Sequence, residues 1–154
     1  MNNLLQTIND TFFYNNDGLY YKKNNKRAGY ENPAGYRIIQ ISGKNHKEHR
    51  LVWLIYYGSL PNSDLDHIDR NKSNNNINNL RLATKQQNCY NKGKQKNNSA
   101  GFRGVTFYKK SNKFQAQIQI NYKKIHLGLF TDINDAIQAR KDAEQKYFGM
   151  FAPK

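Results

Sequence analysis

The stretch Leu65-Asp66-His67-Ile68-Asp69 decides how this sequence is interpreted. It sets a carboxylate beside an imidazole directly after an apolar residue, a pairing that taken alone is typical of ordinary surface turns. Two asparagines follow it, Asn79 at 12 residues after His67 and Asn88 at 22 residues after Asp66. Imidazole can accept a proton, and carboxylate and amide oxygens bind hard cations. The combination therefore indicates a chemical site rather than a solvated turn.

An apolar helix is expected just before this stretch, over residues 47–57. Leu51, Leu54 and Ile55 recur at helical spacing, and Gly58 stands where a helix commonly ends. Such a helix would bury one face and support the polar residues that follow it in the chain.

Taken together, these segments resemble the HNH endonucleases, above all the homing endonucleases of phages. The resemblance covers roughly residues 10–92. It is carried by His49-Arg50-Leu51-Val52-Trp53, Asp66-His67-Ile68-Asp69, Asn74-Asn75, Asn78-Asn79-Leu80-Arg81 and Asn88. It implies an N-terminal ββα-metal fold, in which two strands and a helix surround one divalent cation.

The same resemblance implies a role for each matched residue. His67 matches the general base that takes a proton from the attacking water, and Asn79 matches the central asparagine that shapes the loop and orients the histidine. Asp66 and Asn88 would be the protein ligands of the metal. Many family members have histidine in place of Asn88, so the neighbouring Asn91 stays open as an alternative ligand.

One divalent cation is the expected cofactor. Mg²⁺ prefers oxygen ligands such as those of Asp66 and Asn88, and Mn²⁺ is the alternative. The single cysteine, Cys89, excludes a multi-cysteine zinc site. Arg50 and Arg81 are candidates for holding neighbouring phosphates, although both fit equally well as surface charges without an assigned contact.

The charge of the chain points to a polyanionic partner. The 154 residues include 25 Lys and Arg against 11 Asp and Glu, a formal net charge of +14. Between Asp69 and Asp132 there are 13 basic residues and no acidic one. A long segment of one sign, interleaved with aromatic and aliphatic residues, is typical of a folded surface that contacts phosphates. The expected partner is double-stranded DNA.

No membrane association is expected. The longest apolar stretch, residues 51–57, is far shorter than the roughly 20 residues that span a bilayer. The N-terminus lacks the pattern of a signal peptide. We therefore expect a cytoplasmic protein, in the cytoplasm of a bacterial host if a phage encodes it, with no small-molecule cofactor.

The chain is expected to hold two domains of an α+β fold. Residues 1–92 would form the nuclease domain and residues 93–100 a basic linker without apolar periodicity. Residues 101–154 would form a three-stranded antiparallel sheet packed on one helix. The strands are expected at 101–106, 113–121 and 124–130, and the helix at 133–148.

The second domain resembles the APETALA-two type of DNA-binding domain over about residues 99–149. The resemblance is carried by Gly101-Phe102-Arg103-Gly104-Val105, Lys113 to Ile118, His126 to Phe130, Asp135-Ala136-Ile137 and Ala143. It implies a sheet laid in the major groove with the helix behind it. The groove-facing residues would be Arg103, Lys109, Lys113, Gln115, Gln117, Gln119 and Lys124. Glutamine can pair with adenine, whereas lysine mainly neutralises phosphate.

The function expected from the sequence is a site-recognising, divalent-metal-dependent DNA endonuclease of the homing type. The alternative is a non-catalytic, sequence-specific DNA-binding protein that retains the HNH scaffold. The intact set Asp66, His67, Asn79 and Asn88 favours the enzyme. No clear dimer motif is present, so a monomer is favoured while the oligomeric state stays open.

Overall fold

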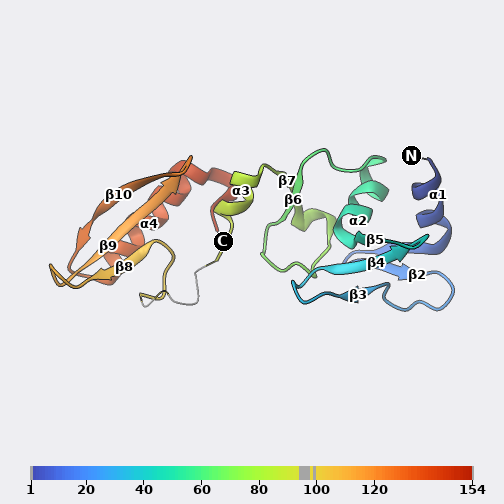
Figure 1. Cartoon of the computed structure of the whole chain (residues 1–154), viewed down its shortest axis with the longest axis horizontal. Coiled ribbons are helices and arrows are strands. Elements are labelled where there is room, and N and C mark those ends of the chain that lie inside the picture. Colours follow the sequence, from blue (N-terminus) through green and yellow to red (C-terminus); the bar gives the residue numbers. More distant parts are fainter. Residues whose placement is uncertain (1, 94–97, 99, 154) are drawn as a thin grey trace. The chain divides into compact units, whose positions relative to one another are not determined.

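The computed structural model describes residues 2–93, 98 and 100–153. The chain forms two compact units, Met1–Lys85 and Gln86–Lys154 (Figure 1). Most of the expected linker, residues 94–97 and 99, lies outside the described residues. Among the residues that are described, no helix has the length and apolar character needed to cross a membrane.

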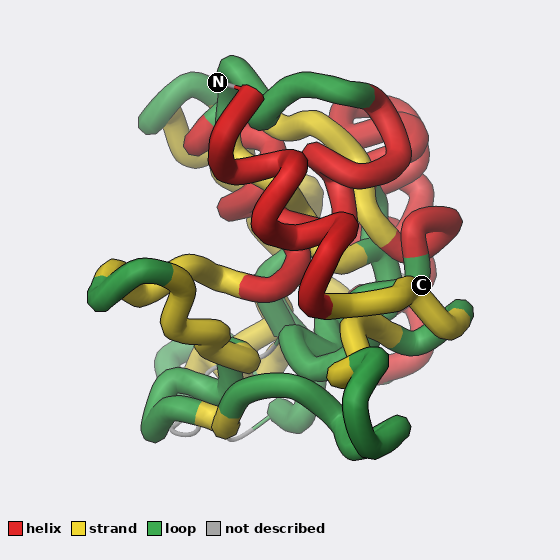
Figure 2. The backbone as a smooth tube through the Cα atoms, turned by 90° about the vertical axis from the view of Figure 1, so that its right-hand side faces the viewer, coloured by secondary structure: helices red, strands yellow, loops and turns green. Residues whose placement is uncertain are grey.

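The first unit begins with a helix, α1 (Asn2–Thr11), which leads directly into strand β1 (Phe12–Asn15) (Figure 2). No helix ahead of residues 47–57 was predicted from the sequence, so α1 was missed there. Its apolar residues Leu4, Leu5 and Ile8 fall on one helical face and pack into the core, where Ile8 is fully buried. A helix this short is only marginally stable by itself, so its stability comes from that packing, and its few apolar residues give only a weak signal in the sequence.

Short antiparallel strands make up most of the remaining first unit. β1 pairs with β2 (Gly18–Tyr21), and β3 (Tyr30–Glu31), β4 (Arg37–Ile41) and β5 (Lys44–Lys47) form a sheet in the order β3-β4-β5. In β4, Ile39 and Ile41 are buried on one face of the strand, while on the other face Ile38 is buried and Gln40 is exposed.

Helix α2 (Glu48–Tyr57) confirms the helix expected over residues 47–57. Leu51, Val52 and Leu54 are buried in the core that α2 shares with α1 and β2. Gly58 ends the helix in the left-handed conformation, with φ of 74°, and its N–H donates to the Leu54 carbonyl. The helix therefore anchors the chain immediately before the Asp66-His67 strand.

The polar segment of interest spans two strands and two short helices. β6 (Asp64–His67) pairs antiparallel with β7 (Leu80–Ala83), and the single 3₁₀ turn η1 (Ile77–Asn79) leads into β7. The register places Asp66 opposite Arg81 and His67 opposite Leu80. Helix α3 (Lys85–Tyr90) follows. The chain therefore runs from strand to strand to helix in this segment, and the ββα-metal arrangement itself stays a prediction.

Helix α3 groups almost entirely with the second unit. The ring of Tyr90 stacks on that of Phe148, with centroids 3.9 Å apart. The guanidinium of Arg103 donates to the carbonyls of Cys89, Tyr90 and Lys92. The last carbonyls of a helix have no hydrogen-bond donor within the helix, and Arg103 supplies donors to them here.

The second unit is a three-stranded antiparallel sheet with one helix. β8 (Val105–Tyr108), β9 (Lys113–Ile120) and β10 (Lys123–Phe130) lie in the order β10-β9-β8. Helix α4 (Ile133–Phe148) contacts all three strands, and the 3₁₀ turn η2 (Gly149–Phe151) follows it. Val105, Ala116 and Ala136 are fully buried between sheet and helix.

Arg140 of α4 is buried together with its charged guanidinium group. The residue is 2% exposed and its guanidinium forms an ion pair with Glu144, with Nη2 and Oε1 2.8 Å apart. Its Nη1 donates to the Gln117 carbonyl at 2.6 Å. The charge is tolerated because a partner of opposite sign and a backbone acceptor are buried with it.

Candidate active site

The end of β6 holds the two residues at the centre of the candidate site. Asp66 and His67 are each 5% exposed. Because neighbouring side chains on a strand point to opposite faces, Asp66 and His67 contact different groups. Asp66 Oδ2 accepts hydrogen bonds from Arg81 Nε at 2.8 Å and Nη2 at 2.7 Å, directly across the β6-β7 pair. His67 Nε2 lies 3.0 Å from Asn75 Oδ1.

Asn79 organises the loop between β6 and β7. Its Nδ2 donates to Asp69 Oδ1 and to the Asn74 carbonyl, both at 2.9 Å, and its Oδ1 accepts from the Asp69 N–H at 3.0 Å. Burial acts to raise the pKa of Asp69, but hydrogen bonds from Asn74, Asn71 and Asn79 outweigh it and lower that pKa. These hydrogen bonds tie Asn79 to Asp69 and Asn74 within the loop, and a role of Asn79 in orienting His67 stays a prediction.

His67 lies in an environment that favours the neutral imidazole. Burial lowers its pKa, although the hydrogen bond with Asn75 and the nearby charges of Asp69 and Asp66 oppose that shift. The ring of His49 meets it edge on, with centroids 5.1 Å apart. Burial, with His67 and nearby cations adding to it, lowers the pKa of His49 to about 3. A neutral histidine at cellular pH can accept a proton.

Two lysines that sequence reasoning did not single out lie close to this pair. The ring of Tyr36 is 6.3 Å from that of His67 by centroids. Lys47 Nζ and Lys72 Nζ lie over the Tyr36 ring at 4.4 and 4.7 Å from its centroid. Both lysines are exposed, so their ammonium groups are available to an anion beside the histidines.

Asn75 and Glu48 are the other polar residues that sequence reasoning missed. Asn75 lies in the polar segment between β6 and η1 and is 1% exposed, and Glu48 is fully buried at the start of α2. The sequence does set Glu48 apart, since it is the only acidic residue between Glu31 and Asp64. Its role depends on contacts between segments distant in the sequence.

The other sequence candidates of the first domain lie in different places. Arg50 Nη2 donates to the Pro61 carbonyl at 3.1 Å, beside a cavity of about 400 Å³. Arg81 is held by Asp66 in an ion pair whose side chains are 10% and 6% exposed. Asn88 is half-buried on α3, in the second unit. The structure thus places Asp66 and His67 next to each other on β6 and Asn79 in the adjoining loop, and a ligand role for Asn88 stays a prediction.

The donor set fits a hard cation better than zinc. Among the described residues, no group of three or more His, Cys, Asp and Glu side chains could hold a metal. Asp66 supplies one buried carboxylate. That is enough for Mg²⁺, which keeps several waters and takes only one or two carboxylates together with substrate phosphates. A cation at Asp66 would share that carboxylate with the guanidinium of Arg81.

In the second unit, most of the expected DNA-binding residues share one face. Gln115, Gln117 and Gln119 alternate along β9 with the buried Ala116 and Ile118, so they point away from α4. Lys124 of β10 pairs with Gln119 across the two strands, so the two side chains lie on the same face of the sheet. Lys113 begins β9 on the same side, and Lys109 lies in the exposed turn before it.

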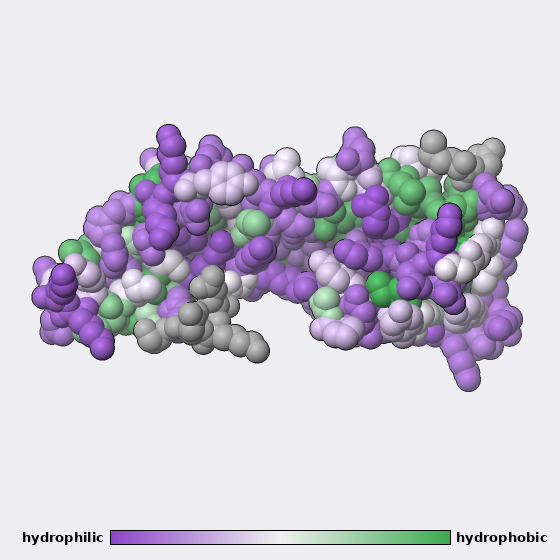
Figure 3. Space-filling model, viewed as in Figure 1, coloured by the Kyte–Doolittle hydropathy of each residue, from purple (hydrophilic) through white to green (hydrophobic). Residues whose placement is uncertain are grey.

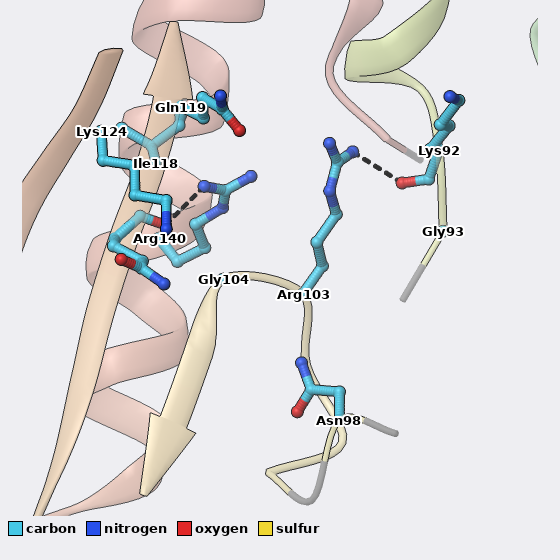
Figure 4. Close-up of a pocket in the computed structure, with 10 residues that line it drawn as sticks. Lys92, Gly93, Asn98, Arg103, Gly104, Ile118, Gln119, Lys124 and Arg140 are labelled. Atoms are coloured by element: carbon cyan, nitrogen blue, oxygen red, sulfur yellow. Dashed lines mark hydrogen bonds between the residues drawn. The ribbon is translucent and has the colours of Figure 1, made fainter. Parts of the chain in front are cut away.

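Arg103 lies elsewhere in the unit, before β8. Its guanidinium is held by the carbonyls at the end of α3 and faces Arg140 across a cavity of about 410 Å³ (Figure 4). Burial lowers the pKa of Arg103, and the charge of Arg140 lowers it further. Lys124 and Gln119 line the same cavity. A DNA contact by Arg103 stays a prediction.

The surface seen in Figure 3 is largely hydrophilic over both units. Exposed lysines account for much of this character, for example Lys109, Lys123 and Lys124 in the second unit. Such a surface suits a partner that carries many charges rather than an apolar one.

A comparison with protein families matches residues 46–90 to the HNH endonucleases. This segment contains the Asp66-His67 strand, the loop shaped by Asn79 and helix α3. The chain is also 33% identical, over 129 residues, to a protein of Acanthamoeba polyphaga mimivirus named as an uncharacterised HNH endonuclease. That match covers 82% of this chain and 66% of the relative.

Two further relatives match shorter segments. A second mimivirus protein named as an uncharacterised HNH endonuclease is 37% identical over 87 residues, which are 52% of this chain and 26% of the relative. Protein 3.8 of Escherichia phage T7 is 30% identical over 82 residues, or 53% of this chain and 68% of that protein. The chain therefore spans 66% and 26% of the two mimivirus relatives. No solved structure matches the chain.

These matches identify the class to which the site belongs. The Asp66-His67 strand, the asparagine-shaped loop and the following helix are those of an HNH domain. The chain belongs to the HNH endonuclease family, and its relatives are viral proteins, two from a giant virus and one from a phage.

Proposed function

We propose that this protein is a site-recognising DNA endonuclease of the homing type that hydrolyses phosphodiester bonds with the help of one divalent cation. The observation that carries this proposal is the buried His67 next to Asp66 on β6, inside the segment that matches the HNH family, where burial lowers the pKa of the His67 imidazole. Hydrolysis needs a group that takes a proton from water next to a negatively charged phosphate, and this pair supplies both a base and an oxygen ligand.

His67 is the general base in this proposal. Its neutral imidazole takes a proton from the water that attacks the scissile phosphate, while Asn79 keeps the adjoining loop in place. Lys47 and Lys72 hold neighbouring phosphates, since both are exposed beside the Tyr36 ring next to His67. Electrostatic contacts of this kind position the backbone of DNA without reading its sequence.

The cation would be held by Asp66, and Asn88 is the proposed second protein ligand, with Asn91 as the alternative. Mg²⁺ is the proposed ion and Mn²⁺ the alternative, because carboxylate and amide oxygens suit hard cations. When bound, it supplies Lewis-acid stabilisation of the charge on the scissile phosphate and on the leaving oxygen. Arg81, already paired with Asp66, keeps that carboxylate oriented.

The second unit contributes site recognition. Gln117 and Gln119 face away from α4 and can pair with bases, and Lys124 lies beside them to neutralise a phosphate. This arrangement supports an APETALA-two type of binding, in which the sheet enters the major groove and α4 stays behind it. Recognition and cutting would then be carried by separate parts of the chain.

A cleavage assay tests the proposal. Supercoiled plasmid DNA carrying a library of viral and phage fragments is incubated with the protein and Mg²⁺, Mn²⁺ or chelator, and the new ends are sequenced. We expect metal-dependent cuts at a restricted set of sites. His67→Ala should remove the cuts, whereas His46→Ala, which changes a half-buried histidine on β5, should keep them.

The same assay addresses the alternative function. If the wild-type protein binds selected fragments in a gel-shift experiment but leaves every one uncut with either metal, the non-catalytic DNA-binding role replaces the nuclease. Cuts that persist in His67→Ala would instead show that another group is the base.

A further inference from the structure

A buried chain of hydrogen bonds leads from His67 into the core of the first unit. His67 Nε2 is 3.0 Å from Asn75 Oδ1, and Asn75 Nδ2 donates to Glu48 Oε2. All three residues are 5% exposed or less. Glu48 belongs to α2 and lies 27 residues before Asn75 in the sequence, so the chain of bonds joins two elements of the fold.

Glu48 fixes the direction of every bond in this chain. Its Oε1 accepts from the Leu19 N–H at 2.7 Å, and its Oε2 accepts from Arg27 Nη2 at 2.9 Å. A carboxylate in an ion pair can only accept hydrogen bonds. The Asn75 amide must therefore turn its NH₂ group toward Glu48, which leaves its carbonyl oxygen facing His67.

The orientation of Asn75 in turn selects the tautomer of His67. An amide oxygen only accepts, so the ring nitrogen beside it, Nε2, must carry the proton. In a neutral imidazole the other nitrogen, Nδ1, is then the basic one. We propose that Glu48 and Asn75 are positioning residues that hold His67 as the Nε2–H tautomer and make Nδ1 the atom that receives the proton from water. The role of Nδ1 rests on the proposed nuclease function.

The backbone around Glu48 is built to admit this carboxylate. A Cβ atom added at Gly18 would lie 2.5 Å from Glu48 Oε1 and 2.2 Å from Arg27 Nη2, so a larger residue there would displace the end of the Glu48 or Arg27 side chain. A buried carboxylate is costly in an apolar core, and a hydrophobic residue would often be equally stable there. A role in orienting Asn75 gives the buried charge a function that packing alone does not.

Two substitutions separate positioning from packing. In Glu48→Gln, the new amide can donate to Asn75 Oδ1, which lets the Asn75 amide turn over and present its NH₂ group to His67. The His67 proton should then move to Nδ1. In Asn75→Leu, a side chain of similar size removes the acceptor, so both tautomers should be populated. Asn78→Ala, an exposed residue of the same loop, is the control.

The tautomer is read directly by NMR. Long-range ¹H–¹⁵N correlation spectra of the full chain at pH 7.5, with His67 assigned through His67→Gln, distinguish a protonated from an unprotonated ring nitrogen. We expect wild type and Asn78→Ala to show the proton on Nε2, and both test variants to lose that preference. In plasmid cleavage, the kcat of the test variants should fall by about 10- to 100-fold with little change in KM. This loss is smaller than the full contribution of a general base, because His67 itself remains.

The two readouts distinguish failure of this inference from failure of the proposed function. A wild-type proton on Nδ1, or an Nε2–H tautomer that persists in both variants, overturns the inference even if DNA is cut. An Nε2–H tautomer that depends on Glu48 or Asn75 in a protein that cuts no DNA supports the positioning and overturns the nuclease. If Glu48→Gln does not fold, Asn75→Leu alone decides.

Discussion

The imidazole of His49 meets that of His67 edge to face, with ring centroids 5.1 Å apart and an interplanar angle of 84°. Both side chains are 5% exposed. Two imidazoles this close repel each other if both are protonated, and burial disfavours the charge on each. The pair therefore keeps both rings neutral, and this relationship has a consequence for stability as well as for chemistry.

The free energy of unfolding should fall as the pH is lowered below about 6.5, because His49 then stays neutral in the folded protein but becomes protonated in the unfolded one. Its folded pKa of about 3 lies below its ordinary value of 6.5, so the unfolded state binds more protons between those values. The stabilisation is complete above pH 6.5 and is lost as the pH falls toward 3. One such group contributes a slope of up to about 1.4 kcal/mol per pH unit.

Urea unfolding at pH 7 to 5 measures this slope. The single tryptophan, Trp53, lies in α2, so its fluorescence follows unfolding of the first unit. His49→Phe should lose most of the slope, whereas His126→Phe, in the second unit, should keep it. Equal slopes for wild type and His49→Phe would contradict the buried, neutral His49.

Removing the side chain of Asn79 should unfold the loop that presents His67. The amide makes three hydrogen bonds, two to Asp69 and one to the Asn74 carbonyl. We expect Asn79→Ala to lower the free energy of unfolding by about 1–3 kcal/mol, because backbone and side-chain groups of the loop lose their partners. Tryptophan fluorescence in urea tests this, with Asn78→Ala as the control. A loss no larger than that of Asn78→Ala would mean that the loop holds its shape without Asn79.

Breaking the Arg140–Glu144 ion pair from one side should destabilise the second unit strongly. Arg140→Met leaves Glu144 buried at 5% exposure without its partner. The expected loss is about 3–5 kcal/mol. Replacing both residues, as in Arg140→Met with Glu144→Leu, should restore a large part of it. Circular dichroism is the suitable probe because the only tryptophan lies in the first unit. A double variant as unstable as the single one would show that the Gln117 carbonyl contact dominates instead.

Lys124 and Gln117 should affect DNA binding in different ways. If Lys124 neutralises a phosphate, Lys124→Ala weakens binding to all sequences and lowers the slope of log K against log salt by about 1. If Gln117 pairs with a base, Gln117→Ala leaves that slope unchanged and relaxes the preference at one position by about 1–3 kcal/mol. Fluorescence anisotropy with selected fragments at several salt concentrations measures both effects.

Lys146→Ala serves as the control for that experiment. It removes the same charge from the exposed side of α4, away from the face of β9 that carries Gln117. A loss of salt slope equal to that of Lys124→Ala would mean that the charge acts through the whole surface rather than through a contact at the sheet.

Much of the architecture could be predicted because it depends on local patterns. Helix α2 was expected from apolar residues at helical spacing and the following Gly58, and it forms there. The alternation along β9 likewise predicted which side chains would share a face. Helix α1 was missed because its apolar residues are few and its stability comes from packing against α2.

The sequence by itself determined the chemistry-bearing residues of the site. Asp66, His67 and Asn79 follow one another within 14 residues, a spacing that can be seen without any structure. Their relation is local, since β6, the loop and β7 form one continuous segment. The same holds for the basic character of the chain after Asp69.

Only the tertiary structure decided which other groups act on that site. Asn75 is one of 23 asparagines, and nothing in its neighbours distinguishes it until the fold places it between His67 and Glu48. The hydrogen bond from Asn75 to Glu48 and the edge contact of His49 with His67 both join residues far apart in the chain. Hydrogen bonds and burial depend on distance in space, and sequence spacing does not measure that distance between separate elements.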